Sequence, residues 1–261
     1  MTRQTSGLVK HDDIASRLIY ELKTRGFAYI SSAQCGELLG VPSGSFRPYA
    51  ESWERLDPDR WMGDGGTYRK RRFAAFAVEW GAVVRKPHQP HYQSRLHNQL
   101  NGGVDRWFSP VEPQIADQPI TDALLRLGDA LGRRIVDTPN PCWHAEMHQF
   151  RIEAKTFESA TPTPEGLHRD GVALVIMMLV ARQNMLGGVT GIRGMDGRRI
   201  AEIELDSPLE MVIVDDRRVQ HVVTSIKPTN PSAPAIRDAL VLTFQPQQIS
   251  QSRSSASANH R

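Results

Sequence analysis

Two histidines and an aspartate have the types and spacing needed to bind one metal ion. His168 and Asp170 are two residues apart, and His221 lies 51 residues after Asp170 in a strand-like run. On an extended strand, residues i and i+2 point to the same face, so both side chains can reach one ion. Two imidazoles and one carboxylate form the facial triad of non-haem Fe(II) sites, which leaves coordination positions open. Four closed ligands would instead indicate structural zinc.

Arg237 offers an anion site that would accompany this triad. It lies 16 residues after His221 and opens an apolar, strand-like run. A guanidinium can hold the distal carboxylate of a dicarboxylate through two parallel hydrogen bonds while the near end chelates the metal. Taken singly, each residue has a simpler interpretation: a chance His-x-Asp, a buried hydrogen-bonded His221, or a surface salt bridge between Arg237 and Asp238. The ordered set favours the metal site.

A second histidine group leaves an alternative open. His144, Glu146 and His148 would share one face of a strand, as in cupin-type metal sites. The group lacks the His-Glu-x-x-His pattern of zinc proteases and the Pro-Cys-x-x-Cys partner of zinc deaminases. His88 and His91 form a weaker pair, which we interpret as part of a loop.

The segments that must position these residues change in character along the chain. Apolar residues at helical spacing predict helices over residues 12–24, 31–39 and 119–136, and residues 27–30 are typical of a strand. Residues 40–118 show weak periodicity. From Trp143 onward, turn residues separate seven strand-like runs: 143–154, 172–181, 188–193, 200–205, 209–214, 219–226 and 239–244. The run 172–181 does not alternate, which predicts that both of its faces are covered.

This pattern predicts an α+β, mainly β fold: a double-stranded β-helix (jelly roll, cupin-like) with N-terminal helices packed on it. We expect a single domain over residues 11–244. Residues 11–140 would be helical and loop-rich support, and 141–244 the core strands with the iron site. Residues 1–10 are expected to be a flexible arm and 245–261, which are polar and of low complexity, a disordered tail.

Composition narrows the class of protein. The 261 residues carry a net charge of +3, but two basic residues in 1–10 and two in 245–261 leave the rest at −1. A near-neutral body argues against nucleic acid as a partner. Only Cys35 and Cys142 are present, which excludes a disulfide framework. No apolar run is long enough for a membrane span or typical of a signal peptide, so we expect a cytoplasmic protein without a membrane partner.

Several stretches resemble one family, the bacterial Fe(II)/2-oxoglutarate-dependent dioxygenases that include L-isoleucine 4-hydroxylase and related biofilm and stress proteins. The resemblance covers about residues 25–246 and lies in 68–73, 90–93, 101–108, 148–151, 164–171, 184–188 and 237–244. It implies that His168, Asp170 and His221 bind Fe(II) and that Arg237 holds 2-oxoglutarate. The implied reaction uses O2 and hydroxylates an unactivated C–H of a free or N-substituted L-amino acid, while 2-oxoglutarate becomes succinate and CO2.

An amino-acid substrate needs a partner for its carboxylate. Arg151 is our candidate because it lies in a strand-like run, whereas the basic run 69–72 is more typical of a solvated face. The family often has an acidic or aromatic residue where this chain has Val172-Ala-Leu, and Gly-Gly-Glu-Ser where it has Gly187-Gly-Val-Thr190. These differences leave the substrate open. Alternatives are a non-catalytic sensor of 2-oxoglutarate or iron and, less favoured, a nucleic-acid demethylase. A homodimer is also compatible with the sequence, with residues 40–118 as a lid or interface.

Overall fold

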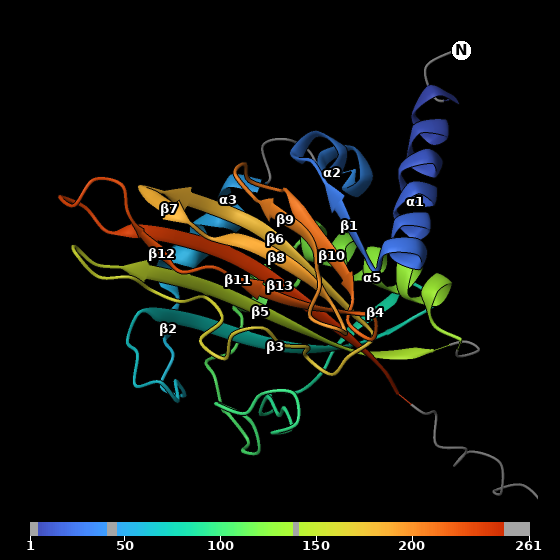
Figure 1. Cartoon of the computed structure of the whole chain (residues 1–261). Coiled ribbons are helices and arrows are strands. Elements are labelled where there is room, and N and C mark those ends of the chain that lie inside the picture. The colour runs from blue at the N-terminus through green and yellow to red at the C-terminus, as the bar shows by residue number, and fades with distance from the viewer. Residues whose placement is uncertain (1–4, 41–45, 138–140, 248–261) are drawn as a thin grey trace, which may run out of the picture.

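A computed structural model of the chain describes residues 5–40, 46–137 and 141–247. Its centre is an eight-stranded sheet with the order β1-β10-β6-β13-β5-β3-β2, in which β4 pairs with β3 (Figure 1). All the pairs in this sheet are antiparallel. The strands are β1 (Phe27–Ile30), β2 (Asp57–Pro58), β3 (Arg69–Glu79), β4 (Ala82–Arg85), β5 (Cys142–Ala154), β6 (Leu174–Gln183), β10 (Met211–Asp215) and β13 (Ala235–Gln247).

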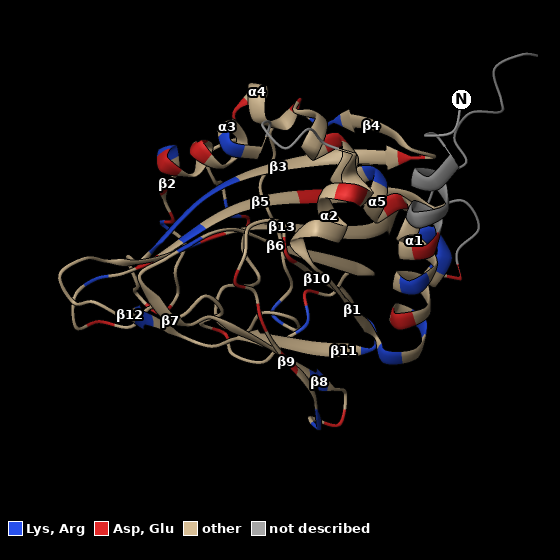
Figure 2. Cartoon of the chain, turned by 90° about the horizontal axis from the view of Figure 1, so that it is seen from above, with Lys and Arg blue, Asp and Glu red and all other residues tan. Residues whose placement is uncertain are grey.

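Shorter strands form a second layer under this sheet. One group has the order β11-β8-β9, and β12 pairs with β7. These strands are β7 (Met185–Gly187), β8 (Val189–Gly194), β9 (Arg199–Glu204), β11 (Val219–Val223) and β12 (Ile226–Pro228). Figure 2 shows them on the face of the large sheet opposite the helices.

The helices cover the outer face of the large sheet. They are α1 (Thr5–Arg25), α2 (Ser32–Leu39), α3 (Phe46–Ala50), α4 (Pro113–Ala116) and α5 (Pro119–Ile135), with a 3-10 turn at Glu51–Arg55. α5 buries the apolar stripe predicted for it, including Ile120, Leu124 and Leu131, because such a stripe must face the core. None of the described helices has the length and apolar character needed to span a membrane.

Strand β6 shows why its uniformly apolar sequence was informative. Leu174, Ile176 and Met178 pack in the core shared with the helices, whereas Val175 and Met177 pack toward the second layer. Successive side chains of a strand point to opposite faces, so a strand buried between two layers must be apolar at every position. The predicted mainly β jelly roll with N-terminal helices is therefore confirmed.

The ends of the domain differ from the prediction where the structure describes them. α1 begins at Thr5, so residues 5–10 of the predicted arm are helical, while residues 1–4 lie outside the described part. β13 continues to Gln247 because residues 245–247 keep their pairing with β5. The first three residues of the predicted tail, 245–247, therefore belong to the sheet. Residues 248–261 lie outside the described part.

Strand β3 adds a long strand to residues 11–140, which were predicted to be helical and loop-rich support with one strand at residues 27–30. This 11-residue strand pairs with β5 along most of its length, and β1 also belongs to the main sheet. Arg69 and Arg71 are buried, and Lys70 and Arg72 alternate with them. Figure 2 shows this basic stretch inside the sheet. Polar residues on a buried face hide the hydrophobic alternation by which a strand is normally detected.

Candidate metal centre and its cavity

A cavity lies between the two layers, lined by alternate residues of the sheet. From β5 it receives Glu146, His148, Phe150 and Ile152, and from β13 Arg237, Ala239, Val241 and Thr243. β3 contributes Arg69 and Arg71, and β11 contributes His221 and Val223. His168 and Asp170 line it from the loop before β6. The cavity therefore collects side chains that are far apart in the sequence but share the inner faces of the jelly roll.

The predicted triad is assembled in this cavity. One ligand atom from each of His168, Asp170 and His221 lies within 4.8 Å of the others. His221 Nε2 is 3.4 Å from Asp170 Oδ2, and His168 Nε2 is 3.9 Å from Asp170 Oδ1. His221 lies in β11 as predicted, but His168 makes a single β-bridge to it and Asp170 lies in a loop. The extended strand predicted for His168 and Asp170 is thus reduced to one bridge.

A buried aspartate holds that loop in place of strand pairing. Asp216 accepts hydrogen bonds from the backbone N–H groups of Asp170, Gly171 and Val172, at 2.8–3.1 Å. A carboxylate that accepts several backbone N–H bonds fixes the peptide units that donate them. The loop can therefore present Asp170 reproducibly without belonging to a sheet.

The hydrogen bond of His168 leaves its Nε2 available to a metal. His168 Nδ1 lies 2.9 Å from the carbonyl oxygen of Gly166, which can only accept, so Nδ1 carries the proton. His221 Nδ1 lies 4.0 Å from Asp216 Oδ1 and forms no hydrogen bond within the described part of the chain, whereas Nε2 faces Asp170 Oδ2. Metal-binding histidines commonly direct the other ring N–H at a carbonyl or carboxylate. The donor set of the triad fits a divalent metal ion.

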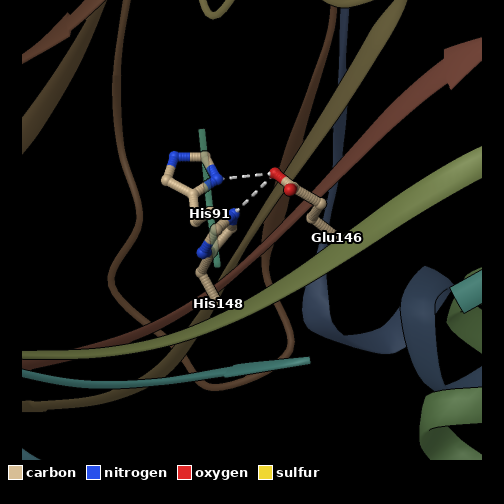
Figure 3. Close-up of side chains that lie close together, drawn as sticks. All are labelled: His91, Glu146 and His148. Carbon is tan, nitrogen blue, oxygen red and sulfur yellow. Dashed lines mark hydrogen bonds and ion pairs between the residues drawn. The ribbon is translucent and has the colours of Figure 1, made fainter. Parts of the chain in front are cut away.

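A second histidine–carboxylate cluster lies in the same cavity. His91 Nδ1 is 2.9 Å from Glu146 Oε2, and His148 Nε2 is 3.5 Å from the same oxygen (Figure 3). His144 Nε2 is 3.3 Å from the other oxygen, Oε1. The structure brings ligand atoms of His91, Glu146 and His148 within 4.8 Å of one another. In the predicted alternative triad of His144, Glu146 and His148, His91 therefore takes the place of His144.

The protons of this second cluster are arranged differently. Arg71 Nη2 lies 2.7 Å from His148 Nδ1. Because a guanidinium can only donate, Nδ1 must accept, and the proton of the neutral ring then lies on Nε2, which faces Glu146. Burial lowers the pKa of His148 to about 3, so the ring stays neutral. With Nε2 protonated, His148 has no lone pair to offer a metal, and the cupin-type alternative is not supported.

Arg237 is in the cavity, as predicted for a residue that binds an anion. It is 6% exposed, and no described residue forms a hydrogen bond or ion pair with its guanidinium. Burial lowers the pKa of Arg237 to about 10, which still leaves it charged at neutral pH. A buried cation without a counter-ion is costly, so this position is suited to an anionic ligand.

Arg151, the residue predicted to bind the substrate, lies on the opposite face of the sheet. It donates to Asp238 from Nε and Nη2 at 2.8 and 2.7 Å, and to Glu54 from Nη1 and Nη2 at 2.7 and 2.6 Å. The register explains this position. Asp238 pairs with Arg151, and Arg237 pairs with Ile152. Because neighbouring residues of a strand point to opposite faces, Arg237 faces the cavity and Arg151 lies on the face of the sheet away from it. Arg151 has a structural role instead.

Other cavity residues were missed or ranked too low by the sequence analysis. Arg71 and Arg106 are 4% and 3% exposed, and the Nε of each has no hydrogen-bond partner in the described part of the chain. Glu165 Oε2 is likewise buried without one. The sequence offered one signal for all three residues: Arg71, Arg106 and Glu165 each lie in a stretch that carries the family resemblance. Burial distinguishes Arg69 and Arg71 from the half-buried Lys70 and Arg72 of the same basic run.

The comparisons with known proteins agree with this fold and site. A family model described as 2OG-Fe dioxygenase matches residues 50–243. A 3(1)-hydroxy-L-isoleucine 4-dioxygenase of Pantoea ananatis is 31% identical over 173 residues, covering 64% of this chain and 68% of its own length. The chain belongs to the 2OG-Fe dioxygenase family, whose members use Fe(II), 2-oxoglutarate and O2.

Solved structures share the same fold. A bsmA homolog from Methylobium petroleophilum PM1 is 34% identical with a TM-score of 0.79, covering 89% of this chain and 93% of its own. IDO from Bacillus thuringiensis has a TM-score of 0.75 at 19% identity, covering 90% of this chain and 100% of its own. At that identity the second likeness concerns the fold alone. Both support the jelly-roll fold.

Proposed function

We propose that this protein is an Fe(II)/2-oxoglutarate-dependent dioxygenase that hydroxylates an unactivated C–H of a free amino-acid-like substrate. His168, Asp170 and His221 would hold the iron, and Arg237 the distal carboxylate of 2-oxoglutarate. The observation that carries the proposal is the triad of His168, Asp170 and His221 in one cavity with a buried arginine, Arg237, that has no partner among the described residues. Bound iron, 2-oxoglutarate and O2 supply the oxidising chemistry, with succinate and CO2 as co-products.

The polar groups of the cavity support a zwitterionic substrate. Among the described residues, Arg71 and Arg106 each keep a buried Nε–H without a partner, and Glu165 keeps a buried carboxylate oxygen without one. Arg71 is held rigidly, because its guanidinium lies 3.7 Å from the ring centre of Phe108 and 4.5 Å from that of Phe150. An α-carboxylate would satisfy the arginines and an α-ammonium would satisfy Glu165. The name of the Pantoea relative refers to an amino-acid substrate of the same kind.

The remaining cavity residues exclude water and orient the substrate. Val172, Met177, Val223 and Val241 are apolar lining residues close in sequence to the triad or on neighbouring strands. Such a lining suits an aliphatic side chain and keeps competing water away from the reacting carbon. Cys35 and Cys142 are free thiols, which fits our proposal of a reducing, cytoplasmic location.

The test is oxygen-dependent succinate formation by the full chain loaded with Fe(II), with a panel of aliphatic L-amino acids and their N-acetyl and methyl-ester derivatives. We expect a free amino acid to stimulate succinate and to give a product heavier by one oxygen atom, whereas its derivatives are poor substrates. Failure of every amino acid would reject the hydroxylase and favour the sensor. Equal use of N-acetyl forms would reject the role of Glu165.

Arg237→Ala tests the cosubstrate site in the same assay. Losing two hydrogen bonds to a charged group costs about 3 kcal/mol, so we expect the KM for 2-oxoglutarate to rise about a hundredfold. Arg126→Ala is the matched control, since Arg126 forms an exposed pair with Asp122 and does not line the cavity. An unchanged KM in Arg237→Ala would reject this assignment.

A further inference from the structure

A loop over the cavity contacts the metal-binding carboxylate directly. The loop is closed at its base by a β-bridge between His91 and Arg106, whose N–H groups donate to each other's carbonyl oxygens at 2.9 and 3.0 Å. Within it, Gln93 is 8% exposed and lines the cavity. Its Nε2 donates to the backbone oxygen and to Oδ1 of Asp170, both at 3.3 Å. Nothing in the triad pattern itself required this contact.

A chain of buried amides holds Gln93 in this orientation. Asn98 Nδ2 donates to Gln93 Oε1 at 3.1 Å, and the backbone N–H of Asn101 donates to Asn98 Oδ1 at 2.7 Å. Asn101 Oδ1 in turn accepts from the backbone N–H of Gly63 at 2.7 Å. Backbone N–H groups only donate and the carboxylate only accepts, so each side-chain amide can point only one way. The loop and the segment at Gly63 thus fix which atom Gln93 presents to Asp170.

A second contact joins the same loop to the turn after Asp170. Gly171 has a φ of +81°, and a Cβ at this position would lie 2.3 Å from Cδ2 of His97. Only glycine can adopt this conformation and also allow so close an approach. The loop therefore touches the triad segment at two adjacent residues, one through a hydrogen bond and one through packing.

We propose that Gln93 is a positioning residue that selects which oxygen of Asp170 binds the metal. The inference rests on the proposed function, in which Asp170 is a metal ligand. Gln93 occupies Oδ1, and Oδ2, 3.4 Å from His221 Nε2, is the oxygen left for the ion. An aspartate held in this way binds through one oxygen. The site then keeps the open positions that a facial triad provides for cosubstrates.

The test measures metal affinity rather than turnover. Mn2+ is titrated into the full chain without oxygen, in the presence of 2-oxoglutarate, and its dissociation constant is followed by electron paramagnetic resonance. Gln93→Leu keeps the approximate size but cannot donate, and we expect a dissociation constant about 10- to 100-fold higher, as for other groups that orient metal ligands. Gln114→Leu is the matched control, because Gln114 is exposed and bonds only to Glu112 among the described side chains.

A second variant acts one step further along the amide chain. Asn98→Asp still accepts from Asn101 but cannot donate to Gln93, so we expect a smaller loss of affinity than in Gln93→Leu. Wild-type affinity in both variants, with Mn2+ binding lost in Asp170→Asn, would overturn the inference and leave the metal site standing. Equal losses in Gln93→Leu and Gln114→Leu would also overturn it. Retention of Mn2+ binding by Asp170→Asn would reject the proposed metal site itself.

Discussion

Arg151 and Arg237 show how a single step along a strand decides the role of an arginine. Both lie in strand-like runs, and the sequence favoured both as carboxylate partners. Only the pairing register of β13 with β5 separates them, because it places Arg237 and Ile152 on the cavity face and Asp238 and Arg151 on the other. Spacing within one strand is visible in a sequence, but the register between strands depends on the assembled sheet. The triad could be predicted because His168 and Asp170 lie two residues apart in one segment, and His221 lies in a strand-like run of its own.

Arg151→Ala separates a structural role from a substrate role. Arg151 is nearly buried and pairs with Asp238, which is 2% exposed, so its removal leaves a buried carboxylate uncompensated. We expect the free energy of unfolding to fall by about 3–5 kcal/mol. The KM values for substrate and 2-oxoglutarate should stay near wild type in the folded fraction.

A urea titration followed by kinetics checks this expectation. Arg126→Ala is the control, since Arg126 pairs with Asp122 in an exposed i,i+4 contact that contributes little to stability. Normal stability together with a raised substrate KM would restore Arg151 to the binding site.

At the scale of elements, β6 and β3 mark what the sequence could predict. β6 was found because a strand between two apolar layers is apolar throughout. β3 was missed because its cavity face carries Arg69 and Arg71, and their burial depends on partners elsewhere in the chain: Asp59 lies 2.7 Å from Arg69, and His148 lies 2.7 Å from Arg71. A polar cavity therefore conceals the strands that build it.

The contact between α5 and β13 makes a prediction at this scale. A Cβ on Gly128 in α5 would lie 2.0 Å from the ring of Phe244, so the helix packs on the strand without room for a methyl group. We expect Gly128→Ala to lower the free energy of unfolding by about 1–3 kcal/mol through overpacking. Gly36→Ala in α2 is the control, because nothing lies within 4 Å of its Cβ position.

Thermal and chemical unfolding of both variants provide the measurement. Gly36→Ala should raise stability by about 0.5–1 kcal/mol, the usual gain for alanine over glycine inside a helix. Equal effects of the two substitutions would contradict the close approach of α5 and β13.

The whole molecule encloses titratable groups, and this makes its stability depend on pH. Burial lowers the pKa of His148 from 6.5 to about 3 in the folded state. Below pH 6.5 the unfolded chain therefore binds a proton that the folded chain rejects, and the free energy of unfolding falls as the pH drops toward 3. Burial alone would raise the pKa of Glu146, but nearby histidines hold it well below its ordinary value, so this carboxylate adds to the loss in acid.

His148→Gln tests this dependence. A glutamine can accept from Arg71 and donate to Glu146 without titrating, so we expect a shallower loss of stability between pH 6.5 and 4. Unfolding titrations at several pH values measure the slope. The same slope in both proteins would exclude His148 as a source of the acid sensitivity.

The place of β13 in the large sheet has a consequence for how the protein is made. β5 and β6 do not pair with each other, since β13 lies between them and bonds to both. During synthesis, the chain through residue 234 therefore carries two long strands with unpaired edges and an unfinished cavity. Such edges are prone to associate with other chains. The large sheet can join β5 to β6 only after β13 has been translated through Gln247. The nascent chain therefore depends on rapid insertion of this one strand or on protection by chaperones.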